Sequence, residues 1–390
     1  MTIGYPIGMS GGLRNRGKTR GDVKERREAV EEYADTRLEY MSSYTIDPTL
    51  ASKNIENMIG CIQVPLGFAG PLKVIGDHAE GEFLVPMATT EGALVASVNR
   101  GCSVITRAGG ARAEVEHDFM TRAPVFKTKD IAHSREVVQW IRDHFSEIKE
   151  SAESTTGHGR LGSIQPLRTG RNLYLRFAYE TGDAMGMNMT TMATEEAARY
   201  IEENTGATLV SVSGNVCVDK KPAGINSLLG RGKTVHAECL IPGKTVEEKL
   251  HTSPEDVEEA GIRKNLIGSA MALSYGQNAH MANMLAAMYI ATGQDPAQVV
   301  EGSMGMTTCE TIGKDLYMAV RIPALEVGTV GGGTRLPCQR EALSMIGCEG
   351  GGKAKKLAEI IAATVLAGEL STLSAEAAGH LSSAHRELGR

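Results

Sequence analysis

Hydrophobic and polar positions in the middle of the chain follow the two-residue repeat of strands in some segments and the longer repeat of helices in others. Residues 171–179 (RNLYLRFAY) and 207–218 (ATLVSVSGNVCV) alternate in the manner of half-buried strands. Residues 193–204, which lie between them, have the pattern of a helix. The order strand, helix, strand predicts a small α/β module over roughly 122–212.

Other segments predict further helices and strands. Pro and Gly interrupt residues 55–75, where turns and short strands are expected, and a strand end or loop leads into a helix over 87–105. The remaining predicted elements are an amphipathic helix over 22–40, a helix over 130–150, a strand over 234–241 and an Ala-rich helix over 353–386 with weak points at Gly368 and Gly379.

A long stretch without acidic or basic side chains, residues 265–294, has the length of a membrane span. It nevertheless contains four polar side chains that are costly in lipid: Gln277, Asn278, His280 and Asn283. The pattern therefore favours a long helix over 264–292, buried inside the protein and ending at Gly293. No association with a membrane is expected.

Composition narrows the class of protein. A chain of 390 residues, 42% of them hydrophobic, can form two or three domains with a sizeable core. The net charge of −6 gives no sign of nucleic-acid binding or of attraction to an anionic membrane. Seven widely spaced cysteines without a CxxC pair predict reduced thiols and no metal site. Since no signal peptide is apparent, a cytoplasmic protein is expected.

Residues Gly12 to Thr19 (GLRNRGKT) match the phosphate-loop pattern GxxxxGK[ST]. Such a loop needs a buried strand before it and a helix after it, so that backbone amides and the helix dipole hold phosphate. The preceding residues contain Pro6 and several glycines and make a poor strand. A chance match in a solvated basic arm is the favoured interpretation, and a nucleotide-binding protein is kept as the alternative.

Four rare polar positions lie among small or apolar neighbours. They are Glu91 in PMATTEG, Lys220 beside Lys221 in DKKPAGIN, Asp295 in GQDPAQ and His385 in SSAHREL. Each alone has an ordinary explanation, because a Glu at a helix start is usually a cap and an Asp before Pro usually opens a helix. The triple glycine at 331–333 alone is a turn signal.

In combination, eight segments resemble the class I 3-hydroxy-3-methylglutaryl-coenzyme A (HMG-CoA) reductases. They follow the family's order and spacing from about residue 50 to the C-terminus. The segments are ENMIG (56–60), PMATTEG (86–92), GDAMGMNM (182–189), SGNVCVDKKPAGIN (213–226), KNLIGSAM (264–271), GQDPAQ (293–298), EVGTVGGGT (326–334) and GELS…AAGHL…H (368–385). The second and third are similar to class I and not to class II forms, and the chain resembles a soluble archaeal or bacterial member.

The resemblance implies an α+β fold in three parts. A small helical N-terminal region is expected over 1–57, and a large HMG-CoA domain with a C-terminal flap over 58–121 and 213–390. A ferredoxin-like NAD(P)-binding domain is expected as an insertion over 122–212, and the large domain would surround the buried helix at 264–292. The family builds its active site across a subunit interface, so a homodimer or a dimer of dimers is implied.

The implied reaction is the reduction of HMG-CoA to mevalonate and CoA with two NAD(P)H, a step of isoprenoid biosynthesis. Each reduction places negative charge on an oxygen, and the resemblance gives the stabilisation of that charge to Lys220. It gives protonation of the CoA thiolate to His385 on the flap, while His380 is interpreted as structural. Glu91 is implied as the proton donor to the aldehyde oxygen, and Asp295 as an acid coupled to both Glu91 and Lys220.

The resemblance also implies two sets of binding residues. Those for the substrate are Arg122, whose guanidinium suits a carboxylate, with Ser213, Asp219, Lys221, Lys264 and Asn283 for the HMG group, and Ser97, Asn99 and Arg100 for CoA. Those for the cofactor are Asp183, Ala184, Met185, Gly186, Met187 and Asn188 on the inserted domain, and Gly331, Gly332, Gly333 and Thr334 on the large domain.

NADPH is the expected cofactor, with NADH open as the alternative. Animal members hold the 2′-phosphate with a Ser-Arg pair at positions that correspond here to Thr156 and Gly157. His158 or Arg160 is the candidate substitute in this chain.

Two other functions fit parts of the pattern. A CoA-binding module without catalysis would lack at least one of the four catalytic residues, and all four are present. An enzyme of the same family that works in the oxidative direction, on mevalonate, is not distinguished by the sequence.

Overall fold

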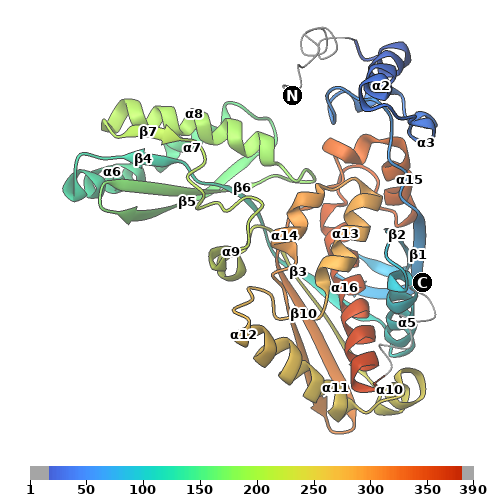
Figure 1. The fold of residues 1–390 in the computed structure, drawn as a ribbon. Coiled ribbons are helices and arrows are strands. Elements are labelled where there is room, and N and C mark those ends of the chain that lie inside the picture. Colours follow the sequence, from blue (N-terminus) through green and yellow to red (C-terminus); the bar gives the residue numbers. More distant parts are fainter. Residues whose placement is uncertain (1–16, 380–390) are drawn as a thin grey trace, which may run out of the picture.

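The computed structural model describes residues 17–379, which form a helical N-terminal part, a large unit and a small unit that projects from its side (Figure 1). The N-terminal part consists of helices α2 (Arg20–Ala34), α3 (Glu39–Ser42) and α4 (Pro48–Ala51). The predicted helix over 22–40 therefore ends early, because Asp35 takes up the left-handed conformation that terminates α2.

The large unit is built on a sheet with the strand order β2–β1–β3–β8–β10–β9. Neighbouring strands are antiparallel except β1 and β3, which are parallel. The strands are β1 (Leu66–Gly76), β2 (Glu80–Ala88), β3 (Ala111–Arg122), β8 (Gly232–Ile241), β9 (Met306–Ile312) and β10 (Asp315–Leu325). The helices of this unit are α5 (Leu94–Arg107), α9 (Gly224–Leu229), α10 (Gly243–Leu250), α11 (Pro254–Ala260), α12 (Ser269–Met271), α13 (Met281–Thr292), α14 (Val299–Gly302), α15 (Pro337–Met345) and α16 (Ala354–Ala377), with a π-helix at Gly261–Gly268 and 3₁₀ turns at Pro296–Gln298 and Gly332–Arg335.

Helix α16 runs through the centre of the large unit, and its apolar side chains belong to the main hydrophobic core. It is apolar around most of its circumference, as expected for a helix buried on all sides. Glycines allow other helices to approach it closely: Gly101 of α5 lies against the carbonyl of Ala367, and Gly368 lies against Met284 of α13. Among residues 17–379 only α16 has the length and hydropathy of a membrane span, and 94% of that apolar window is buried inside the fold.

The predicted central helix at 264–292 is wrong, because residues 272–280 interrupt it. The break is stabilised by polar contacts: Asn278 Nδ2 donates to the carbonyls of Ser303 and Gly305. The buried carboxylate of Glu369 on α16 accepts hydrogen bonds from the amides of Ala279 and His280, just before α13 begins. Three of the four polar residues that argued against a membrane span, Gln277, Asn278 and His280, therefore lie in a loop, and Asn283 lies in the first turn of α13. The central helix is α16.

The small unit has its own hydrophobic cluster, separate from the main core. Its sheet has the order β7–β4–β6–β5, covered by α6, α7 and α8 (Figure 1). The elements are β4 (Val125–Lys127), α6 (Ile131–Asp143), α7 (Phe145–Glu153), β5 (Arg160–Thr169), β6 (Asn172–Glu180), α8 (Met187–Thr205) and β7 (Thr208–Ser211). The predicted strand at 207–218 is too long, because the chain leaves the sheet after Ser211 and enters a loop with left-handed residues.

Strand β3 belongs to both sheets. Its first part, Arg112–Phe119, pairs with β8 of the large unit, and its last three residues, Met120–Arg122, pair with β6 of the small unit. The chain thus enters the small unit at Arg122, and it leaves again after β7.

The candidate phosphate loop lies partly outside the described residues, but its end is described. Thr19 caps α2, and its side chain accepts a hydrogen bond from the Asp22 amide. The Asp22 carboxylate in turn accepts from the Thr19 amide at 2.8 Å. A carboxylate at the start of α2 repels phosphate, which argues against nucleotide binding there.

Candidate active site

Lys220 and Asp295 form an ion pair at the junction of the two units. Lys220 Nζ lies 2.8 Å from Asp295 Oδ2, although the two residues are far apart in sequence. Asp295 is held in place because it follows the C-terminal Gly293 of α13 and caps the 3₁₀ turn at Pro296–Gln298. The hydrogen bond to Asp295 raises the pKa of the Lys220 ammonium, against the opposite influence of burial. The pair therefore presents a lysine that stays protonated.

The loop that carries Lys220 has an unusual backbone. Val218 and Lys220 both have positive φ angles, of 54° and 59°. Non-glycine residues rarely adopt this conformation, so the surrounding structure has to hold it. The Lys220 amide donates to Glu301 Oε1 at 2.6 Å, and Asn226 Nδ2 donates to Glu301 Oε2 at 2.8 Å.

Asp219, the residue before Lys220, lies among donors. Its carboxylate is 3.1 Å from Arg231 Nη2, 3.0 Å from Gln298 Nε2 and 4.0 Å from Arg122 Nη1. Burial raises its pKa, but the Gln298 hydrogen bond and the neighbouring cations outweigh this and lower the pKa overall. Asp219 and Arg122, two predicted substrate residues, are therefore close together.

The other predicted substrate residues of this loop lie nearby. Lys221 Nζ donates to the Asp219 carbonyl at 3.0 Å. The Ser213 hydroxyl lies 3.6 Å from the Cys217 thiol.

A first cavity of about 630 Å³ contains the Lys220–Asp295 pair. Its walls come from both units and from the N-terminal part, and nearly all of the predicted cofactor residues line it. The lining residues are Lys53, Asn54, Ala184, Met185, Gly186, Met187, Asn188, Met189, Lys220, Gly293, Gln294, Asp295, Pro296, Gly328, Val330, Gly331, Gly332, Gly333 and Thr334.

Asp183 is the predicted cofactor residue that is not part of this lining. Its carboxylate accepts hydrogen bonds from the amides of Gly352, Lys353 and Ala354 at 2.6 to 3.0 Å, at the start of α16. Burial raises its pKa, but these three hydrogen bonds and the charge of Lys233 lower it overall. Asp183 thus fastens the small unit to the central helix.

A second cavity, of about 320 Å³, contains Glu91. Asn283 Nδ2 lies 3.2 Å from Glu91 Oε1 and 3.2 Å from His280 Nδ1. The lining residues are Glu91, Gly92, Ala93, Leu94, Ala96, Ser97, Arg100, Lys264, Ala279, His280, Asn283, Thr372, Ala375 and Glu376.

Predicted CoA residues lie in and beside the second cavity. Arg100 donates to the Ser371 hydroxyl at 3.0 Å, and Ser97 contacts the same hydroxyl at 2.9 Å. Asn99 is outside the lining, and its side chain accepts from the Gly70 amide. Lys264 forms an ion pair with Glu376.

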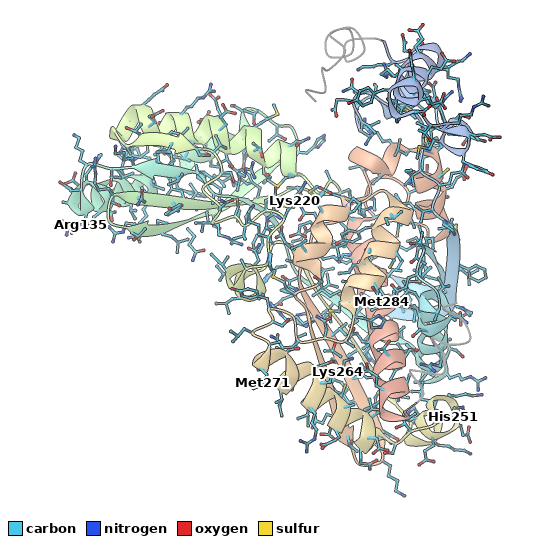
Figure 2. The ribbon with its side chains drawn as sticks, in the orientation of Figure 1. Arg135, Lys220, His251, Lys264, Met271 and Met284 are labelled. Atoms are coloured by element: carbon cyan, nitrogen blue, oxygen red, sulfur yellow. The ribbon has the colours of Figure 1, made fainter. Side chains whose placement is uncertain are left out.

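Of the three predicted catalytic residues that the structure describes, Lys220 and Asp295 are therefore in contact within one chain, and Glu91 is not part of that pair. Glu91 lines a different cavity, and His385 lies outside the described residues, as does His380. Figure 2 shows Lys220 where the small unit meets the large unit, and Lys264, a lining residue of the second cavity, lower in the large unit.

Four residues that contact the site were missed by the sequence analysis as site residues: Arg231, Glu301, Glu326 and His280. The first three are buried and ionisable, and they support the Lys220 loop from behind. Glu326 begins the segment EVGTVGGGT (326–334), so the family pattern contained a signal for it. For Arg231 and Glu301 the one sequence signal is a charged residue inside a largely apolar segment, which does not separate a buried network from a surface position.

Comparisons with known proteins identify the family. The family model described as hydroxymethylglutaryl-coenzyme A reductase matches residues 22–390. The 3-hydroxy-3-methylglutaryl-coenzyme A reductase of Methanocaldococcus jannaschii is 55% identical over 372 residues, covering 94% of this chain and 92% of that protein. The Xenopus laevis enzyme of the same name is 49% identical, covering 85% of this chain and 38% of that protein.

Solved structures share the fold. The class II HMG-CoA reductase of Streptococcus pneumoniae, bound to NADPH in open conformations, superposes with a TM-score of 0.70 at 20% identity and covers 94% of this chain and 99% of that one. The mixed helix-and-sheet fold is thus confirmed. With a family model over nearly the whole length and archaeal relatives above half identity, the chain belongs to the hydroxymethylglutaryl-coenzyme A reductase family.

Proposed function

We propose that this protein reduces HMG-CoA to mevalonate and CoA, consuming two NADPH and two protons in each turnover. The observation that carries the proposal is the Lys220–Asp295 ion pair in a cavity lined by residues 184–188, where α8 begins, and by the glycines 331–333. The protonated amine suits a carbonyl substrate, because it can stabilise negative charge on the oxygen. The glycines suit a dinucleotide, because they let the backbone come close to a ligand.

Lys220 stabilises the oxygen of the substrate at both reductions. The thioester carbonyl oxygen becomes anionic first, and a hemithioacetal forms. Its C–S bond then breaks, CoA leaves as a thiolate that His385 protonates, and the aldehyde remains. The aldehyde oxygen becomes anionic at the second reduction, and Glu91 supplies the proton that completes the alcohol. Asp295 keeps Lys220 charged throughout.

NADPH supplies the two hydrides when bound, and the cavity fits such a group. Helix α8 begins at the cavity without a side-chain cap, so its first amides are available to an anion. An added Cβ at Gly331 or Gly332 would meet no atom within 4 Å, which leaves open space over this loop. His158 and Arg160 are the candidates for the 2′-phosphate; Arg160 is more than half exposed and lies 3.9 Å from Glu153.

A homodimer, or a dimer of such dimers, completes the site in the cytoplasm. Glu91 and Lys220 lie in different cavities of one chain, so a second copy is needed to bring Glu91 to the substrate. Apolar side chains near Lys264 support an interface there, since Met271 and Leu273 are 82% and 87% exposed.

The test is the loss of nicotinamide absorbance with HMG-CoA, measured with NADPH and with NADH. Lys220→Ala should lower kcat by about 10³-fold or more, because the stabilising cation is lost. Lys244→Ala, an exposed lysine on α10, is the matched control and should keep full activity. Near-normal turnover by Lys220→Ala would disprove the mechanism.

The phosphate-loop alternative predicts a different result. ATP binding that Lys18→Ala abolishes would favour it.

A further inference from the structure

Two buried glutamates share one guanidinium behind the Lys220 loop. Arg231 Nη1 lies 2.8 Å from Glu301 Oε1 and 3.3 Å from Glu326 Oε1. All three side chains are fully buried, and neither glutamate lines the two cavities. The two carboxyl groups are close enough to share a hydrogen bond.

The positive charge of this network is unevenly shared among its acids. Asp219 lies 3.1 Å from Arg231 and has a second cation, Arg122, at 4.0 Å. Buried Arg176 adds positive charge near Glu301, whereas Arg231 is the one cation that contacts Glu326 among the described residues. Uncompensated buried charge is costly, so Glu326 is the acid expected to be neutral.

Glu326 is the acid whose surroundings favour the neutral form. Burial and the charge of Glu301 raise the pKa of Glu326 well above its usual range, against the influence of Arg231. Tyr289, also buried beside it, contributes no positive charge. Among the described residues no donor reaches Glu326 Oε2, so an ionised carboxylate there would remain partly unsatisfied.

Glu301 is the acid that has donors on both oxygens. Oε1 accepts from the Lys220 amide and from Arg231, and Oε2 accepts from Asn226. These hydrogen bonds hold the left-handed backbone at Lys220, whose φ is 59°. A negative charge on Glu301 therefore fixes the direction in which the Lys220 side chain leaves the loop.

We propose that Glu301 and Glu326 are positioning residues that share one proton: Glu326 keeps it and donates to Glu301, and ionised Glu301 holds the Lys220 loop in its working conformation. The kinetic consequences rest on the proposed function, but the protonation of Glu326 does not.

The kinetic test compares two conservative variants. Glu301→Gln places amide hydrogens where Asn226 or Arg231 now donates, so the loop shifts and kcat should fall by about 10- to 100-fold. The KM for NADPH should stay within about twofold, because the glycine loops are untouched. Glu326→Gln keeps a neutral group that can still donate to Glu301, and kcat should stay within about threefold. Glu248→Gln, an exposed glutamate on α10, is the control.

A second variant distinguishes loss of the Lys220 hydrogen bond from misfolding. Glu301→Asp keeps the charge for Arg231 but is one methylene shorter, so it should lose the Lys220 hydrogen bond and show a similar fall in kcat at an unchanged Tm. The proposal would be overturned by an equal fall in kcat in Glu326→Gln and Glu301→Gln, or by full activity in both Glu301 variants.

Infrared spectroscopy tests the shared proton without turnover. The difference between wild type and Glu326→Gln at pH 7 should contain the C=O stretch of a protonated carboxyl group. Glu301→Gln should lose the same band, since Glu326 then ionises beside Arg231. An ionised Glu326 in the wild type would overturn the inference. Failure to reduce HMG-CoA would instead overturn the proposed function, and the infrared result would stand.

Discussion

At the scale of single residues, the charge of Lys220 depends on Asp295. The hydrogen bond between them raises the pKa of Lys220, so its ammonium form persists to higher pH and activity is lost only as the pH rises through that raised value. Asp295→Asn removes the charge, and the alkaline limb of the kcat/KM profile should move to lower pH by about one unit or more. Profiles measured on both proteins test this, with the exposed Asp143→Asn as control. If the alkaline limb of the kcat/KM profile did not move, the loss of activity at high pH would come from the ionisation of a group other than Lys220.

The residues that could be predicted are those that stand out against their local sequence. Lys220 and Asp295 occur in short motifs, and the structure brings them to 2.8 Å. Glu301 occurs in AQVVEGSM, where nothing local distinguishes it from a surface glutamate. Its burial depends on Arg231, seventy positions earlier in the chain. A network of charged side chains that come from distant parts of the sequence leaves no local sequence pattern.

At the scale of elements, the contact of α5 with α16 depends on Gly101. A Cβ at this position would collide with the carbonyl of Ala367, a backbone atom that cannot turn away. Gly101→Ala should therefore lower the free energy of unfolding by about 1–3 kcal/mol, measured by urea denaturation. Gly157→Ala, where a Cβ meets nothing within 4 Å, is the matched control. Equal stability of the two variants would show that the helices can separate without cost.

The start of α16 depends on the Asp183 carboxylate. Asp183→Ala removes the acceptor of three amides and should cost about 1 kcal/mol of unfolding free energy at pH 7. Because the folded pKa of Asp183 is lowered, its contribution is present above the unfolded value of 3.8 and is lost as the pH falls through the folded value. Urea denaturation of both proteins should show the difference narrowing below about pH 4. A pH-independent difference would contradict this account.

Helices with an amphipathic or Ala-rich pattern could be located, but their bounds could not be predicted. The helix predicted over 130–150 is divided at His144 into α6 and α7, and the helix predicted over 353–386 ends at Ala377 as α16. The break at 272–280 could not, because an apolar stretch without charges also fits a continuous helix. Its conformation depends on Glu369, about ninety residues away, which binds the amides of Ala279 and His280.

At the scale of the whole molecule, the separate cavities of Glu91 and Lys220 predict complementation between inactive variants. A site shared by two subunits needs one intact copy of each residue, and these can come from different chains. Mixing Lys220→Ala with Glu91→Ala under conditions of subunit exchange should restore about a quarter of the wild-type activity. Mixed dimers without activity would mean that each chain builds its site alone.

The strand shared by the two sheets ties the predicted substrate residues to the orientation of the small unit. β3 leads the chain into the small unit at Arg122, and β7 leads it out just before Ser213. Both connections thus end on residues predicted to bind the HMG carboxylate. A rotation of the small unit would therefore displace Arg122. Under the proposed function, we expect release of the oxidised dinucleotide and weaker binding of the acyl group to occur together.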